Sequence, residues 1–157
     1  MFCKRLTRGL PTIIMLLAGT AAVAGGINDV IATRQAHYRE IGKAFKAIND
    51  QLKSDSPDLA VIRANAPVVE RLARQQGKEN WFPAGSQAGQ GLQTSAKPAI
   101  WQNRADFEAK RADFLRAAAG YTAITGRGDV AAIGAATATI GKTCKGCHES
   151  YRDQDRS

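Results

Sequence analysis

Residues 130–151, VAAIGAATATIGKTCKGCHESY, contain the pattern that decides the fold. Apolar residues and two cysteines recur three or four positions apart along this stretch, as they do on one face of an α-helix. The residues on this face are Val130, Ile133, Thr137, Ile140, Cys144, Cys147 and Tyr151. The spacing predicts a helix whose cysteines point toward the core. The turn 125–129 before it supplies glycines and an aspartate that can cap its first turn.

Three earlier stretches show the same helical spacing. We expect a first helix over about 28–53, a second that restarts after Pro57 and reaches about Gln76, and a third over about 99–125. Pro67, inside the second helix, predicts a kink or a broken turn. The third helix carries its aromatic residues at seven-residue intervals, at Phe107, Phe114 and Tyr121.

Residues 77–98 lie between the second and third helices and show little periodicity. They are rich in Gly, Gln, Ser and Pro, which is typical of a loop, and Trp81, Phe82 and Leu92 are the residues by which this loop can pack onto the core. No stretch shows the alternation of a strand. Four helices with one long crossover predict an all-α fold, an antiparallel four-helix bundle.

The first 24 residues have the order of parts of a secretory signal peptide. Lys4, Arg5 and Arg8 precede an apolar run over 10–23, and small residues at 22–24 form a cleavage pattern. The run is shorter than the roughly 20 residues that a membrane-spanning helix needs. We therefore expect residues 1–24 to be removed, and residues 25–157 to form one exported domain in the bacterial periplasm, with no membrane attachment.

The remaining domain is moderately basic. The whole chain has a formal charge of +8, and residues 1–24 contain three cations and no anions, which leaves +5 after their removal. These charges are spread along the chain, so they do not predict a nucleic-acid site, but they can attract an acidic redox partner. Cleavage also removes Cys3 and both methionines, so Cys144 and Cys147 are the only thiols left.

Cys144, Cys147 and His148 form a Cys-x-x-Cys-His motif, the attachment pattern of a covalently bound haem c. On a helix these three side chains lie on neighbouring faces, where two thioether bonds and one axial nitrogen can hold a single haem. A structural zinc site is the main alternative, and it would need a fourth ligand such as His37 or a carboxylate. A disulfide oxidoreductase would more naturally carry its cysteines beside a βαβ unit, which this chain lacks.

Four landmarks in the expected order resemble the cytochrome c′ family. They are Arg34-Gln35 in the first helix, WFPAG at 81–85, PAIW at 98–101 and CKGCHESYR at 144–152. The resemblance covers essentially the whole domain after residue 24. Ordinary small cytochromes c attach haem near the N-terminus and use a distant methionine as second ligand, a pattern that this chain does not show. The resemblance implies one covalent haem c per chain.

The resemblance also implies roles for single residues. It makes His148 the only protein ligand of a five-coordinate, high-spin iron, with Arg152 one turn onward, and it places Tyr38 over the open distal face. Low-spin relatives carry a ligating methionine at the position of Tyr38. Arg34 and Gln35 match residues near the haem propionates, although a carboxylate could equally satisfy Arg34. The other implied haem contacts are Thr94 and Ser95 in the loop, and Phe107 and Phe114, which would be core aromatics in any bundle.

An open iron site suggests binding of small gases, electron transfer, or both, rather than enzymatic turnover. We expect nitric oxide or carbon monoxide to bind ferrous iron, with Tyr38 crowding the open site, and electrons to pass to a periplasmic redox partner. One alternative is a low-spin electron carrier in which His37 closes the sixth position, although His37 lies about 100° around the helix from Tyr38. Another is a minor peroxidase or nitric oxide reductase activity, for which Tyr38 is a poor general base.

The resemblance further implies a homodimer formed through the first two helices. Three apolar residues of the second helix lie off its main apolar face and are candidates for the interface: Val61, Val68 and Leu72. They could equally widen the core of a monomer.

Overall fold

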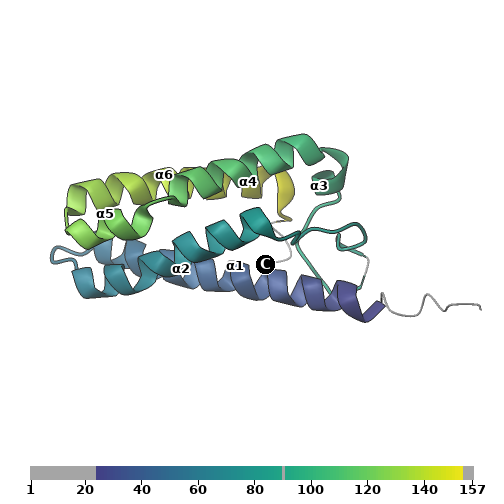
Figure 1. Cartoon of the computed structure of the whole chain (residues 1–157), viewed down its shortest axis with the longest axis horizontal. Coiled ribbons are helices and arrows are strands. Elements are labelled where there is room, and N and C mark those ends of the chain that lie inside the picture. The colour runs from purple at the N-terminus through teal and green to yellow at the C-terminus, as the bar shows by residue number, and fades with distance from the viewer. Residues whose placement is uncertain (1–23, 90, 154–157) are drawn as a thin grey trace, which may run out of the picture.

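A computed structural model describes residues 24–89 and 91–153 of the chain. Helices α1 (Ala24–Leu52) and α2 (Leu59–Lys78) form one antiparallel pair, and α4 (Arg104–Ala118) and α5 (Tyr121–Arg127) pack with α6 (Val130–Tyr151) as the second (Figure 1). The short helix α3 (Ala99–Gln102) ends the crossover between the pairs. The predicted antiparallel four-helix bundle is confirmed. Nearly all of the predicted signal peptide, residues 1–23, lies outside the described residues.

Polar side chains cap the starts of α2 and α6. Asp58 accepts hydrogen bonds at Oδ1 from the backbone N–H groups of Ala60, at 2.8 Å, and Val61, at 3.4 Å. Asp129 accepts a hydrogen bond at Oδ1 from the backbone N–H of Ala132 at 3.1 Å, which confirms the cap predicted before α6. Helix α2 runs through Pro67 without interruption, so the expected break is wrong. Pro67 is exposed, and its ring costs the helix only one backbone hydrogen bond.

The predicted third helix is not continuous. It is divided into α3, α4 and α5, and the second break falls at Ala119, which is extended, and Gly120, whose φ is +75°. Glu70 of α2 accepts hydrogen bonds from the backbone N–H groups of Gly120, at 3.2 Å, and Thr122, at 2.9 Å. These donors have no partner within a helix at its first turn, so the carboxylate stabilises a start of α5 at this place.

The left-handed backbone at Gly120 leads to a stability prediction. Gly120→Ala will lower the free energy of unfolding by about 1 kcal/mol, because a Cβ is disfavoured at positive φ. The cost comes from the backbone alone, since no described heavy atom lies within 4 Å of the position that the new Cβ would take. Gly126→Ala is the matched control: this glycine is also in open space but lies inside α5, so alanine there will stabilise by about 0.5–1 kcal/mol. Urea unfolding measures both, and equal effects of the two variants would contradict the assigned turn.

The core fills the space between the two helix pairs. Its completely buried aliphatic residues come from α1, α2, α3 and α6: Ile31, Ile48, Ile62, Val69, Leu72, Ile100, Ile133 and Ile140. Leu72 is 0 % exposed, so its assignment to a dimer interface is wrong and it belongs to the core of the single chain. Val61 and Val68 are half-buried. Val130 is 40 % exposed at the start of α6, where the bundle ends, so it is not part of the core face.

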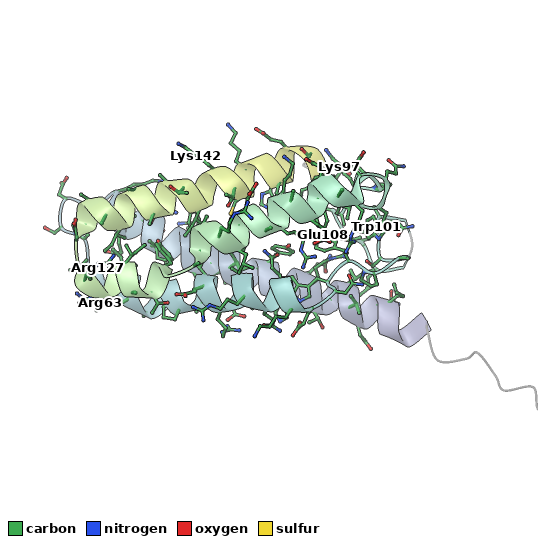
Figure 2. All side chains as sticks on the ribbon, turned by 45° about the horizontal axis from the view of Figure 1, so that its top comes forward. Arg63, Lys97, Trp101, Glu108, Arg127 and Lys142 are labelled. Carbon is green, nitrogen blue, oxygen red and sulfur yellow. The ribbon has the colours of Figure 1, made fainter. Side chains whose placement is uncertain are left out.

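Charged side chains cover the outside of the bundle, and Arg63 and Arg127 lie at the end opposite Trp101 (Figure 2). Arg63 of α2 donates hydrogen bonds to the carbonyl oxygens of Thr125, at 3.4 Å, and Gly126, at 3.5 Å. These bonds join α2 to the end of α5. Of the helices in the described part of the chain, none has the length and apolar character needed to cross a membrane.

Candidate haem site

Helix α6 presents both thiols to the interior near its C-terminal end. Cys144 and Cys147 are free and half-buried, and they pack against the hydrophobic core together with Tyr38 of α1. Burial raises the pKa of both thiols. The pKa of Cys147 rises to about 11, because the charge of the neighbouring Cys144 adds to the effect of burial. The prediction that the cysteines face the core is confirmed. Two thiols one helical turn apart on one apolar face are the donor set that two thioether bonds to a haem require.

His148 follows directly and is also half-buried. Burial, and secondarily the charge of Arg152, lowers the pKa of its imidazole. The neutral ring is the form that offers a lone pair to iron. Arg152 ends the helix by donating its backbone N–H to the carbonyl oxygen of His148 at 3.0 Å. The adjacent Tyr151 carbonyl accepts from the N–H of Lys97 at 3.0 Å, so the crossover loop holds this end of α6 in place.

Tyr38 projects from α1 toward the same interior. Its hydroxyl donates to Oε1 of Gln76 in α2 at 3.0 Å, and its ring meets the edge of Trp81 with 5.5 Å between centroids. Burial raises the pKa of the phenol, and the two nearby thiols contribute to the same shift. Tyr38 therefore remains a neutral hydroxyl that lies close to Cys144 and Cys147, on the inner face where the sequence placed it.

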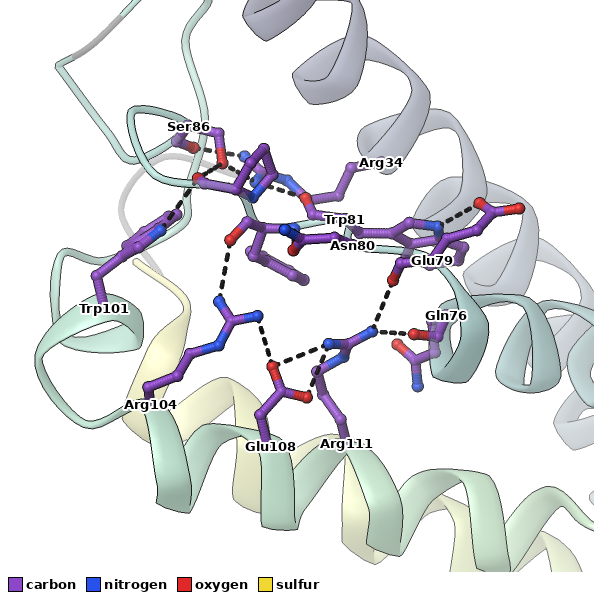
Figure 3. Close-up of polar contacts among 12 residues, drawn as sticks. Arg34, Gln76, Glu79, Asn80, Trp81, Ser86, Trp101, Arg104, Glu108 and Arg111 are labelled. Carbon is purple, nitrogen blue, oxygen red and sulfur yellow. Dashed lines mark hydrogen bonds and ion pairs between the residues drawn. The ribbon is translucent and has the colours of Figure 1, made fainter.

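Arg34 of α1 is buried against the crossover loop and binds that loop through hydrogen bonds. Its two terminal nitrogens donate hydrogen bonds to the carbonyl oxygens of Trp81 and Ser86 and to the Ser86 hydroxyl, at 2.9–3.1 Å (Figure 3). A fourth bond goes to the Thr94 hydroxyl at 3.0 Å. Burial lowers the pKa of the guanidinium to about 10. No carboxylate of the described residues pairs with Arg34, so that alternative is wrong for this structure.

The structure brings the other predicted loop residues to the same region. Gln35 donates from Nε2 to the carbonyl oxygen of Gln93 at 2.7 Å, and the carbonyl oxygen of Ser95 accepts from the N–H of Asp153 at 2.8 Å. Thr94 is buried against Arg34. Arg34 and Gln35 of α1 thus bond to Thr94 and Gln93 of the loop, and Ser95 bonds to the segment after α6. Leu92 is 43 % exposed and does not anchor the loop; Trp81 and Phe82 do.

Aromatic rings form the wall between the loop and α6. Phe107 of α4 packs edge-on against Phe82, at 4.8 Å between centroids, and against Tyr151, at 5.2 Å. The Tyr151 hydroxyl donates to Asp106 at 2.6 Å. Phe114 is buried about two turns further along α4. Apolar walls, two inward thiols and a neutral histidine fit a flat, largely apolar group such as haem.

A family model described as cytochrome C′ matches residues 29–152, nearly the whole described chain. The chain belongs to the cytochrome c′ family. Members of this family carry one covalently bound haem c. The cytochrome c′ of Cereibacter sphaeroides is 29 % identical over 148 residues, which cover 94 % of this chain and 98 % of that protein.

Solved structures of cytochromes c′ show the same bundle. One, reported to undergo ligand-controlled dimer dissociation, has a TM-score of 0.73 and 28 % identity over 82 % of this chain and 97 % of its own. Another is the nitric oxide complex of a variant from Alcaligenes xylosoxidans, with a TM-score of 0.69 and 28 % identity over 82 % of this chain and 96 % of its own. Both similarities extend over the whole bundle.

His37, which both the low-spin and the zinc alternatives name as a possible ligand, lies on α1 against Trp81. The His37 ring stacks on Trp81, with 4.6 Å between centroids, and its Nδ1 is buried without a hydrogen-bond partner among the described residues. His37 and Tyr38 thus both contact Trp81. Within residues 24–89 and 91–153, no three His, Cys, Asp or Glu side chains gather as a zinc site would require. Trp81 and Trp101 are packing anchors, and Trp101 donates to the carbonyl of Pro83 at 3.1 Å.

Sequence reasoning missed Arg111, a second buried cation. Its side chain is 9 % exposed and reaches from α4 to the end of α2, where it donates to the carbonyl oxygens of Gln76 and, at 3.3 Å, of Glu79 (Figure 3). Glu108 accepts from its Nη1 at 2.8 Å. The signal was present in the sequence, because Arg111 lies four residues after Phe107 on the buried face of α4.

Proposed function

We propose that this cytochrome c′ binds nitric oxide and carbon monoxide at a five-coordinate haem iron, with His148 as the only protein ligand. The bound haem supplies an iron that takes up a diatomic ligand and cycles between ferric and ferrous states. The observation that carries the proposal is the position of Tyr38. This side chain lies on the inner face of α1, close enough to both thiols for their charges to act on it, and its hydroxyl donates to Gln76. A neutral hydroxyl is a poor iron ligand. The nitric oxide complex of the Alcaligenes xylosoxidans relative supports the same ligand class.

The remaining site residues orient the haem. Cys144 and Cys147 attach it covalently to α6, and Arg152 stands beside the axial histidine. Arg34 and Gln35, with Thr94 and Ser95, are assigned to the propionate edge, since Arg34 is a buried cation that pairs with no carboxylate of the described residues. The aromatic side chains Phe107 and Phe114 line the pocket from α4.

We assign the protein to the periplasm, after removal of residues 1–24, and we infer that it forms a homodimer through α1 and α2. Val61 and Val68 remain candidates for the interface because both are only half-buried in the single chain. The relative with ligand-controlled dimer dissociation supports a dimer of this fold.

Electron transfer is a second function that the surface favours. Lys145 lies between the two cysteines with its side chain 78 % exposed, and Lys142 is exposed one turn earlier on α6. Two cations beside the haem attachment site suit docking of an acidic redox partner.

An optical and spin-state spectrum of the purified exported protein tests the gas-binding proposal. The ferric and ferrous forms will be high-spin, and the ferrous spectrum will shift when nitric oxide or carbon monoxide is added. In Tyr38→Ala the affinity for carbon monoxide will rise about tenfold or more, because removing a buried aromatic side chain leaves room at the iron.

Trp101→Phe is the control for this comparison, since Trp101 is a packing aromatic on the loop side, and it should leave carbon monoxide affinity within about twofold. A low-spin spectrum that gas does not change would show a second protein ligand. It would reject gas binding and make electron transfer the leading function.

A further inference from the structure

A series of hydrogen bonds joins Tyr38 to three other residues on two helices. The Tyr38 hydroxyl donates to Oε1 of Gln76 at 3.0 Å, and the backbone carbonyl of the same Gln76 accepts from Nη2 of Arg111. Arg111 in turn donates from Nη1 to both oxygens of Glu108, at 2.8 Å and 3.0 Å. The series therefore connects α1 to α4 through the last turns of α2.

Gln76 occupies a position where the helix pattern calls for an apolar side chain. The preceding residues at the same three- and four-residue spacing are apolar, namely Ile62, Ala66, Val69 and Ala73, and Gln76 itself is only 2 % exposed. A buried amide without a hydrogen bond is costly, so such a side chain is retained where a specific partner satisfies it. The structure supplies that partner as the hydroxyl of Tyr38.

Arg111 keeps Gln76 from shifting. Its guanidinium binds the carbonyls of Gln76 and Glu79 at the C-terminal end of α2, where helix carbonyls lack partners within the helix and a positive charge is favourable. The guanidinium also lies against the rings of Phe82 and Phe107, at 5.9 Å and 5.8 Å from their centroids. The amide of Gln76 thus projects from a fixed piece of backbone.

We infer that Gln76 is a positioning residue for gas binding. By accepting the hydrogen bond from the Tyr38 hydroxyl, Gln76 keeps the phenol ring near Cys144 and Cys147 and so limits the affinity for diatomic ligands. The inference rests on the proposed function, in which Tyr38 covers the open side of the iron. A tyrosine ring turns about its χ1 torsion, and one hydrogen bond at its far end restricts that motion. Without the hydrogen bond to Gln76 the Tyr38 ring can rotate away, and the free energy needed to make room for a diatomic ligand falls.

Gln76→Met tests the inference, because methionine has nearly the volume of glutamine but accepts no strong hydrogen bond. Carbon monoxide affinity of the ferrous protein will rise about two- to tenfold, the range that one net hydrogen bond provides. In a Tyr38→Phe background the same replacement will change the affinity by less than about 1.5-fold, because the bond is already absent. Gln76→Glu keeps an acceptor at the same reach and will stay close to the wild-type affinity.

Gln75→Met is the matched control, since the Gln75 amide binds Glu79 at 3.1 Å and not Tyr38. A second readout does not depend on gas: the ¹³Cζ resonance of Tyr38, assigned with Tyr38→Phe, will shift in Gln76→Met and stay in place in Gln75→Met. If Gln76→Met does not fold, Tyr38→Phe removes the same bond from the other side and must raise the affinity by itself.

A rise of equal size in the Tyr38 and Tyr38→Phe backgrounds would overturn the inference, because Gln76 would then act through packing alone. An unchanged Tyr38 resonance in Gln76→Met would also overturn it. These results leave the proposed function standing as long as the wild-type protein binds carbon monoxide. A wild-type protein that binds neither gas would reject both the proposed function and this inference.

Discussion

Replacement of both Cys144 and Cys147 by serine will give a protein that retains no haem after acid extraction. A serine hydroxyl does not form the thioether bond, and the two cysteines are the only thiols in the described part of the chain. Each single replacement leaves one possible thioether and should give a reduced amount of covalent haem. Absorbance of the acid-washed protein, compared with its iron content before extraction, measures the loss.

Lys145→Gln is the matched control for this experiment. Lys145 lies between the two cysteines, but its side chain is 78 % exposed and pairs only loosely with Glu149, at 3.8 Å. Covalent haem should therefore be retained in full. Acid-stable haem in the double serine variant at the wild-type level would be incompatible with the assigned attachment site.

Glu70→Gln will cause the largest loss of stability of the replacements considered, about 2–3 kcal/mol at pH 7. Burial by itself would raise the pKa of this carboxyl. Hydrogen bonds from Thr122, Arg74 and Gly120 outweigh that effect and lower its pKa from 4.5 to about 2. The side chain is 7 % exposed, so solvent screens these interactions little. Urea unfolding of the wild-type and variant proteins measures the difference.

The pH dependence follows from the direction of the Glu70 shift. A carboxyl whose pKa is lower in the folded than in the unfolded protein stabilises the fold above its unfolded pKa. This contribution is complete above about pH 5 and is lost as the pH falls from 4.5 toward about 2. The difference in free energy of unfolding between the wild-type protein and Glu70→Gln should therefore decrease as the pH falls from 4.5 toward about 2.

Glu40→Gln provides the control for a surface ion pair. Glu40 binds Arg71 at 2.6 Å, but both side chains are about half exposed, and such pairs contribute at most about 1 kcal/mol. If Glu70→Gln were no more destabilising than Glu40→Gln, the carboxylate would not be the feature that starts α5.

The bundle and its haem attachment site could be predicted from the sequence because both depend on local spacing. Apolar residues three and four apart define the buried faces of α1, α2 and α6, and the same period aligns Cys144 with Cys147. Arg34 and Arg111 also signal a special environment, since each is a cation on an apolar face. Periodicity alone does not say which atoms satisfy such a cation.

Contacts between distant segments decided the rest. Seven-residue spacing of Phe107, Phe114 and Tyr121 is the same for a continuous and a broken helix, so the break at Gly120 depends on the carboxylate of Glu70, fifty residues earlier. Whether Leu72 lies in the core or on a dimer surface depends on how closely the second helix pair covers α2.

Local residue spacing thus determined the helices, their inner faces and the Cys-x-x-Cys-His site, because each is a property of one helix. Only the tertiary structure assigned loop oxygens to Arg34 and the amide of Gln76 to Tyr38. The physical reason is that buried polar groups must find partners, and those partners come from whichever segments the packing of the core brings together.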